Sequence, residues 1–215
     1  MFEDRESVVV FGAGGHAKVV LATIEAEAKY RITGLLDDDE GKHGKFVLGY
    51  GVLGGRSELE KLRKENVSGA VVAVGNNRFR AEIAECLERK GFELLSAIHP
   101  SASIIRGACL GKGAVVLPFV HVGADAVIGD GCILSVGSVV GHDCELGEWG
   151  HLAPGAKLAG NVRIGRFGFV GMNAVVLPGL QLGSEVVIGA NAVVVNDLSS
   201  GVTAFGVPAR IQGET

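Results

Sequence analysis

The sequence is short of aromatic residues and of long hydrophobic runs. Aromatics make up only 6% of its 215 residues, and no apolar stretch approaches the roughly 20 residues of a membrane-spanning helix. Residues 1–6 carry acidic side chains and lack the apolar segment of a secretory signal. The net charge of −4 gives no electrostatic reason to expect a nucleic acid or an acidic membrane as partner.

Cysteine is also scarce, and none of it is paired in the spacing that metal sites use. The four residues are Cys86, Cys109, Cys132 and Cys144, without a C-x-x-C motif among them. We therefore expect no metal site and a reducing, cytoplasmic setting.

Glycine and aliphatic residues are abundant, and the aliphatic ones recur with a strict period of six. Glycine accounts for 34 of 215 residues. Every sixth residue from position 98 to position 194 is Leu, Ile or Val: Ile98, Ile104, Leu110, Val116, Val122, Ile128, Leu134, Val140, Leu146, Leu152, Leu158, Ile164, Val170, Val176, Leu182, Ile188 and Val194. Neither a helix nor an ordinary strand has this period.

Neighbouring positions repeat in the same phase. The fourth residue after each aliphatic is small or apolar, and the first is often glycine, which we expect to permit a tight corner. Six residues make one short strand and a corner, and three such sides close a coil of eighteen residues. Stacked coils bury what a single coil cannot. The sequence therefore predicts a β-solenoid over residues 98–215.

Residues 1–97 alternate between strand and helix signals. The expected strands are 8–11, 32–36 and 70–74, and the expected helices are 17–28, 58–64 (capped by Ser57) and 78–90. This alternation predicts a small, open, Rossmann-like parallel sheet.

The first of these strands runs into a glycine-rich turn. Gly12, Gly14 and Ala17 satisfy G-x-G-x-x-[GA] between a strand and a helix, and Asp37 follows about twenty residues later. Such a turn either holds a phosphate or simply turns tightly. A full dinucleotide domain needs about twice this length, which disfavours NAD.

His142 interrupts the regular solenoid and is followed by Asp143. It lies two residues after an inward aliphatic, so it is expected on an outer corner. An imidazole beside a carboxylate is suited to removing a proton near neutral pH.

Together these motifs resemble one family along nearly the whole chain. The G-A-G-G-H-A turn, L-D-D, V-G-N-N-R, I-H-P-S-A, the rungs with G-H-D-C and the closing G-V-P-A-R are similar to the sialic acid O-acetyltransferase / nucleotide-sugar N-acetyltransferase subfamily of hexapeptide-repeat acyltransferases. The resemblance implies a left-handed parallel β-helix that trimerises and holds acetyl-CoA between subunits. It also implies N-acetylation of a nucleotide-linked 4-amino-4,6-dideoxy sugar for surface glycans.

The resemblance further implies roles for individual residues. His142 matches the general base and Asp143 its partner acid. The acetyl-CoA contacts are His151, Met172 and Ala190, and the nucleotide-sugar contacts are Gly14, Gly15, His16, Asp37, Asp38 and Gly75. Ser135 stands where many relatives have Asn, which leaves the sugar specificity open.

Three alternatives remain at this point. The chain could O-acetylate a sialic acid, use NAD at its glycine turn, or serve as a non-catalytic scaffold. Trp149, the only tryptophan, could pack on a ligand or on a neighbouring subunit.

Overall fold

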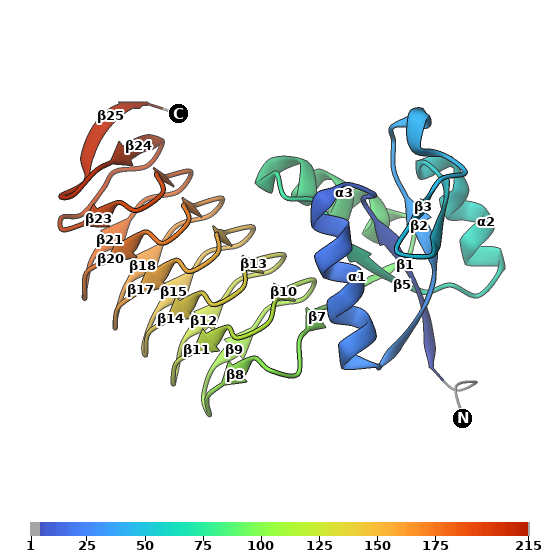
Figure 1. The fold of residues 1–215 in the computed structure, drawn as a ribbon, viewed down its shortest axis with the longest axis horizontal. Coiled ribbons are helices and arrows are strands. Elements are labelled where there is room, and N and C mark those ends of the chain that lie inside the picture. Colours follow the sequence, from blue (N-terminus) through green and yellow to red (C-terminus); the bar gives the residue numbers. More distant parts are fainter. Residues whose placement is uncertain (1–4, 215) are drawn as a thin grey trace. The chain divides into compact units, whose positions relative to one another are not determined.

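A computed structural model describes residues 5–214, and the chain divides into two compact units between Ile98 and His99. The first unit contains helices and a sheet, and the second consists of stacked short strands (Figure 1). No helix within residues 5–214 has the length and apolar character needed to cross a membrane.

The first unit is built on one six-stranded sheet. The elements of this unit are β1 (Glu6–Phe11), α1 (Gly15–Glu27), β2 (Tyr30–Leu36), η1 (Glu40–Lys42), β3 (Phe46–Val47), β4 (Tyr50–Gly54), η2 (Arg56–Glu58), α2 (Leu59–Lys64), β5 (Gly69–Val72), α3 (Asn77–Arg89), β6 (Glu93–Leu94) and β7 (Ala97–Ile98), of which β7 is not part of this sheet. The strand order is β3-β4-β2-β1-β5-β6. The sheet is mixed rather than fully parallel, because β3 and β4 form an antiparallel hairpin at its edge.

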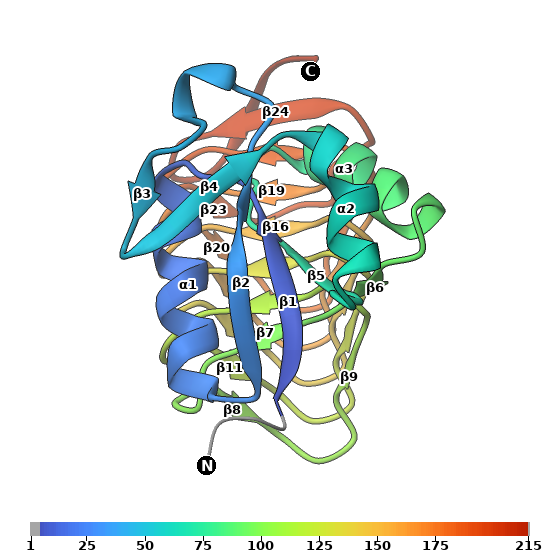
Figure 2. The same cartoon turned by 90° about the vertical axis from the view of Figure 1, so that its right-hand side faces the viewer.

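The connections define where this sheet can bind a ligand. From β1 the chain crosses through α1 to β2 on one side, and from β5 it crosses through α3 to β6 on the other. Right-handed crossovers in opposite directions place α1 on one face and α3 on the other, as Figure 2 shows. The carboxyl ends of β1 and β5 therefore flank a topological switch point, which is where open α/β sheets bind ligands.

Local chemistry sets the helix ends in this unit. The side chain of Asn76 accepts a hydrogen bond of 2.9 Å from the Phe79 N–H and so caps α3. After α3 the chain turns at Gly91, whose φ of +80° favours glycine. The prediction that Ser57 caps the second helix was wrong, because Ser57 lies inside the 3₁₀ turn η2 and α2 begins without a side-chain cap.

The second unit is a parallel β-helix whose sides are two-residue strands. These strands are β8 (Ser103–Ile104), β9 (Cys109–Leu110), β10 (Val115–Val116), β11 (His121–Val122), β12 (Val127–Ile128), β13 (Ile133–Leu134), β14 (Val139–Val140), β15 (Glu145–Leu146), β16 (His151–Leu152), β17 (Lys157–Leu158), β18 (Arg163–Ile164), β19 (Phe169–Val170), β20 (Val175–Val176), β21 (Gln181–Leu182), β22 (Val187–Ile188) and β23 (Val193–Val194). β24 (Val202–Phe205) and the antiparallel β25 (Arg210–Glu214) close the unit.

Three sheets form the sides of this coil. Side 1 contains β8, β11, β14, β17, β20 and β23; side 2 contains β9, β12, β15, β18 and β21; side 3 contains β10, β13, β16, β19, β22, β24 and β25. Strands eighteen residues apart pair in register, as Val139 does with Lys157. The arrangement is consistent with a left-handed β-helix and confirms the predicted solenoid.

The period-six column lines the interior. Its members from Val116 to Val194 are buried, whereas Ile104 in the first coil is 37% exposed. The fourth-position residues fill the space beside them, and Ala126, Cys132 and Ser138 are fully buried. Together these two columns form the core of the second unit.

Glycine is required at the corners for a different reason from the one predicted. From Ile104 to Ile188, the left-handed backbone conformation falls three residues after each aliphatic, at residues such as Asp125, Asp143 and Asn161, whereas the glycine directly after the aliphatic does not adopt it. A side chain at Gly123 would instead place its Cβ 2.6 Å from the backbone nitrogen of His142 in the next coil. Close stacking of the coils, and not the turn, therefore requires glycine there.

Candidate functional site

His142 and Asp143 lie together at the corner between sides 1 and 2. His142 follows β14, and Asp143 turns the chain with a φ of +58°. The Nδ1 of His142 lies 2.6 Å from Oδ2 of Asp143, and their side chains are 71% and 59% exposed. In the tautomer that carries its proton on Nδ1, the ring donates to this carboxylate and the lone pair of Nε2 can accept a proton.

An open groove of about 520 Å³ runs beside this pair. It is lined by Asp125, Val127, His142, Asp143, Glu145, Asn161 and Arg163. The one cation in this lining, Arg163, lies 3.2 Å from Glu145 across the two coils. The remaining carboxylates give the groove a negative character that suits an ammonium group or amine.

His151 stands on side 3, away from the corner that carries His142. Its Nε2 lies 3.2 Å from Oγ of Ser135 in the preceding coil. On the other side its ring meets Phe169 edge to face, with centroids 5.2 Å apart. Ser135 stands where many relatives have Asn, and the structure brings it into contact with His151, a residue predicted to bind acetyl-CoA.

Met172 and Ala190 occupy the corner between sides 3 and 1 in successive coils. The Met172 side chain is exposed, and its carbonyl accepts a hydrogen bond of 2.8 Å from the N–H of Asn191. One chain therefore presents His142, His151 and the Met172–Ala190 corner on three different parts of the coil. The predicted catalytic and acetyl-CoA residues do not converge within a single solenoid.

Trp149 packs within its own chain. Its six-membered ring covers Gly131 of the preceding coil, where a Cβ would collide with it. This contact gives a structural reason for both residues at the corner between sides 2 and 3.

In the first unit, the glycine turn lies at the carboxyl end of β1. Gly14 is the extended residue before α1, and Gly14 and Gly15 are exposed, with no heavy atom within 4 Å of an added Cβ. Gly12 has a φ of +117°, and a Cβ there would lie 2.5 Å from the Ala73 carbonyl oxygen at the end of β5. The turn presents open backbone at a helix N-terminus, which suits an anion.

Asp37 joins the end of β2 to this turn. Its Oδ2 accepts hydrogen bonds from the Ala13 N–H at 2.8 Å and from Lys42 Nζ at 2.9 Å. Partial burial acts to raise the pKa of Asp37, but hydrogen bonds from Lys42 and from the N–H groups of Asp39 and Ala13 outweigh it, so the pKa is lowered. Asp38 lies next to it and pairs with Arg56 at 2.8 Å. Asp37 thus holds the shape of the turn.

Arg80 is a member of this region that sequence reasoning missed. The residue is only 1% exposed, and its guanidinium donates to the carbonyls of Val74 and Gly75 at 3.1 and 3.2 Å and to Asn77 Oδ1 at 2.9 Å. A helix-period signal was present, because Arg80 shares its face of α3 with the buried Ile83 and Leu87.

Arg80 also acts on His16 at the start of α1. Burial, and after it the positive charge of Arg80, lowers the pKa of His16 to about 4. The buried His16 Nε2 has no hydrogen-bond partner among the described residues. The structure therefore brings Gly14, His16, Asp37 and Gly75 to one edge of the sheet, with a neutral imidazole among them.

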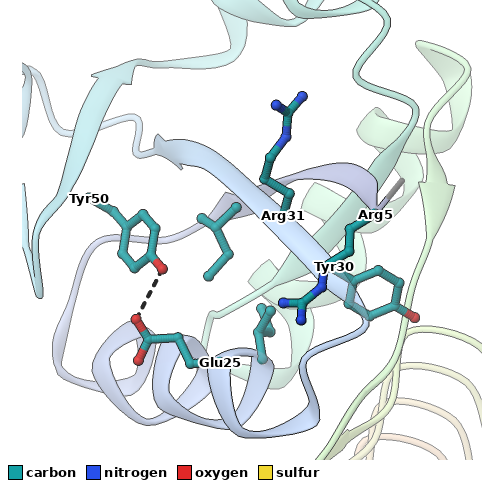
Figure 3. A pocket seen from close by; sticks show the side chains of 7 residues that line it. Arg5, Glu25, Tyr30, Arg31 and Tyr50 are labelled. Carbon is teal, nitrogen blue, oxygen red and sulfur yellow. Dashed lines mark hydrogen bonds between the residues drawn. The ribbon is translucent and has the colours of Figure 1, made fainter. Parts of the chain in front are cut away.

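A separate hollow of about 330 Å³ lies at the opposite edge of the same sheet. Figure 3 shows the Tyr50 hydroxyl bonded to Glu25, at 3.0 Å, on one side and Arg5 beside Tyr30 on the other. Arg5, Tyr30 and Tyr50 stand at the amino ends of β1, β2 and β4. Its position therefore separates it from the switch point. Within residues 5–214, no group of three or more His, Cys, Asp or Glu residues is placed to hold a metal ion.

Stacked hexapeptide coils with an exposed His–Asp pair define a member of the hexapeptide-repeat acyltransferase class. Residues 7–87 match the PglD N-terminal domain family. The solved structure of PerB from Caulobacter crescentus, in complex with CoA and GDP-perosamine, is 42% identical, with a TM-score of 0.92 over 96% of this chain and 97% of that one. The chain belongs to the nucleotide-amino-sugar N-acetyltransferase family of this class, which confirms the predicted resemblance.

Other relatives agree with this membership. The acetyltransferase domain of PglB from Neisseria gonorrhoeae, solved with acetyl coenzyme A, is 38% identical, with a TM-score of 0.89 over 96% of this chain and 99% of that one. UDP-N-acetylbacillosamine N-acetyltransferase from Bacillus subtilis is 35% identical over 52% of this chain and 51% of its own length. GDP-perosamine N-acetyltransferase from Escherichia coli O157:H7 is 30% identical over 54% and 53%. The chain thus spans about half the length of the curated relatives it matches.

Proposed function

We propose that the protein transfers the acetyl group of acetyl-CoA to the 4-amino group of a nucleotide-linked 4-amino-4,6-dideoxy sugar. The observation that carries this proposal is the 2.6 Å contact between His142 Nδ1 and Asp143 at an exposed corner of an otherwise regular solenoid. The His142 side chain is 71% exposed, so it does not belong to the core of the solenoid. The complexes of the solved relatives with CoA, acetyl coenzyme A and GDP-perosamine support the two substrate classes.

The reaction needs only a base and two oriented substrates. The sugar amine attacks the thioester carbonyl while His142 Nε2 takes the proton that the amine loses, and Asp143 stabilises the imidazolium that forms. Backbone N–H groups of the coil stabilise the oxyanion. The C–S bond then breaks, and the CoA thiolate leaves and is protonated. No covalent enzyme intermediate is required, because orientation supplies much of the rate.

The first unit is proposed to hold the nucleotide sugar at the switch point. Gly14 and Gly15 offer backbone N–H groups to the pyrophosphate, and His16 offers a neutral imidazole beside it. Gly75 lines the opposite wall, and Asp37 and Asp38 lie toward the ribose and base. The Asp37 carboxylate is already engaged by Ala13 and Lys42, which favours an indirect role in shaping the turn.

A homotrimer with active sites between subunits is proposed for the second unit. His142 and the Met172–Ala190 pair stand on different corners of one solenoid. A complete site therefore needs His142 from one copy and the Met172–Ala190 corner from a second copy. The four cysteines all lie within residues 5–214 and form no disulfide there, which supports a cytoplasmic location. Sedimentation velocity measures the assembly directly, and a monomer that remains fully active would contradict this arrangement.

The experiment is a panel of UDP-, dTDP- and GDP-linked 4-amino sugars and free sialic acid with acetyl-CoA, followed by thiol release. GDP-perosamine is the first compound to test, because a relative at 42% identity was solved with it. We expect turnover with at least one nucleotide amino sugar and none with free sialic acid. Turnover with sialic acid alone would instead establish O-acetylation. Binding of acetyl-CoA without turnover on any acceptor would favour a scaffold.

The base is tested by His142→Asn on the sugar that the panel identifies. We expect kcat to fall by roughly 10²–10⁴, while His121→Asn, on side 1 one coil earlier, keeps wild-type kcat. Structures of variants of the GDP-perosamine N-acetyltransferase from Caulobacter crescentus, in which one histidine is replaced by asparagine or alanine, have been solved with CoA and GDP-perosamine, so the substitution has a precedent in the family. An unchanged kcat in His142→Asn would refute the assignment.

A further inference from the structure

Gly160 stands at the same corner as His142, one coil further along. The two residues are eighteen positions apart, and the N–H of Asn161 donates to the His142 carbonyl at 2.8 Å. A Cβ added to Gly160 would lie 2.5 Å from Nε2 of His142 and 2.6 Å from its Cε1. The imidazole therefore lies directly against the α-carbon of Gly160.

The backbone gives no other reason for glycine at this position. Gly160 does not adopt the left-handed conformation. The three atoms nearest to its added Cβ all belong to the His142 ring, whereas a Cβ at Gly141 would meet backbone atoms of Ala159 and Gly160. Gly141 is thus needed for coil stacking, whereas the atoms nearest to an added Cβ at Gly160 are those of the imidazole.

We propose that Gly160 is a positioning residue for His142, and this proposal rests on the proposed function of that histidine. Its missing side chain leaves room for the ring to keep Nδ1 on Asp143 while Nε2 stays open to the substrate. A methyl group at 160 cannot remain 2.5 Å from a ring nitrogen, so the ring moves. It then either leaves Asp143 or has its Nε2 covered by the methyl group.

The test is Gly160→Ala, which keeps the backbone N–H and changes only the space. We expect kcat to fall roughly 10- to 100-fold, as small misplacements of a catalytic group do, with the KM of both substrates unchanged within about twofold. Ser184→Ala is the matched control. Ser184 takes the same position in its six-residue unit as Gly160 and lies at a different corner, so this variant is expected to keep wild-type kcat.

A double-mutant cycle separates this role from a structural one. If Gly160 acts only through the imidazole, then Gly160→Ala has no further effect on kcat in a His142→Ala background. An equal fold-loss in both backgrounds would overturn the proposal. So would a wild-type kcat in Gly160→Ala, or a variant that fails to fold, because a contact limited to one exposed ring leaves folding intact.

A measurement that does not depend on enzyme activity separates the positioning role of Gly160 from the base role of His142. Nitrogen NMR signals of the His142 ring, assigned by their loss in His142→Ala, are expected to shift in Gly160→Ala and to stay in place in Ser184→Ala. Unchanged ring signals in Gly160→Ala would overturn the positioning role even if activity fell. If the ring moves but His142→Asn retains full activity, the assignment of the base fails while the steric contact stands.

Discussion

The ring of His16 makes the stability of the first unit depend on pH. Burial and the charge of Arg80 lower its pKa from 6.5 to about 4. The unfolded chain binds a proton at this histidine once the pH falls below about 6.5, whereas the folded chain does not until about pH 4. Unfolding therefore takes up a proton in this window, and stability decreases as the pH falls from 6.5 to 4.

The magnitude follows from the two pKa values. Linkage gives a loss of about 2 kcal/mol between pH 7.5 and pH 5 for this one group. We expect urea unfolding of the wild type to show this loss and His16→Gln, which cannot be protonated, to lack it. His121→Gln is the control, because that half-exposed ring lies in the solenoid, and it should follow the wild type.

An NMR titration tests directly whether His16 has this lowered pKa and whether Arg80 contributes to it. The Cε1–H signal of His16 in NMR should titrate near pH 4 in the wild type and at higher pH in Arg80→Gln, where one of the two causes is removed. A midpoint near 6.5 in the wild type would refute the reasoning, as would a His16→Gln variant that loses the same stability between pH 7.5 and pH 5.

Three further predictions concern the fold. Leu152→Ala empties a fully buried position and should lower the free energy of unfolding by about 2–5 kcal/mol, while Leu177→Ala, at a side chain that is 40% exposed, should cost much less in the same denaturant experiment. Gly129→Ala would place a Cβ 2.5 Å from the Glu148 nitrogen, so thermal unfolding should show a marked loss of stability, and an unchanged Tm would contradict the stacking argument. Asp37→Asn should destabilise the protein at pH 7, and because the folded pKa of Asp37 is depressed, the difference from the wild type should shrink as the pH falls below about 3.9; a constant difference would exclude that cause.

The solenoid could be predicted from sequence because its core is strictly periodic. Any insertion would have broken the phase between Ile98 and Val194, so the column also fixed which residues point inward. The conformation of the corners could not be read in the same way. Glycine marks both left-handed turns and close approach of backbones, and only the structure shows that Asp143 and Asn161 make turns while Gly123 and Gly129 make room.

The two halves of the candidate site differed in how much the sequence revealed. His142 and Asp143 are neighbours in the chain, so their contact needed no fold to predict. Arg80 contacts Val74 and Gly75 and acts on His16 only because the ends of β1 and β5 meet, and a buried arginine on a helix is easily taken for a surface residue. The antiparallel hairpin β3–β4 was missed because β3 has only two residues and β4 contains two glycines among its five residues.

The eighteen-residue coil also sets the spacing of residues along the axis of the solenoid. Paired strands are about 4.8 Å apart, so residues that share a corner can be spaced along the axis only in steps of that size. Inserting or deleting one whole coil between His142 and Met172 would keep the same types of buried contact and yet change the axial offset between the proposed base and a predicted coenzyme A contact by one step. Within this architecture, adding or removing whole coils can therefore change the length of the acyl carrier that fits, while the catalytic residues stay the same.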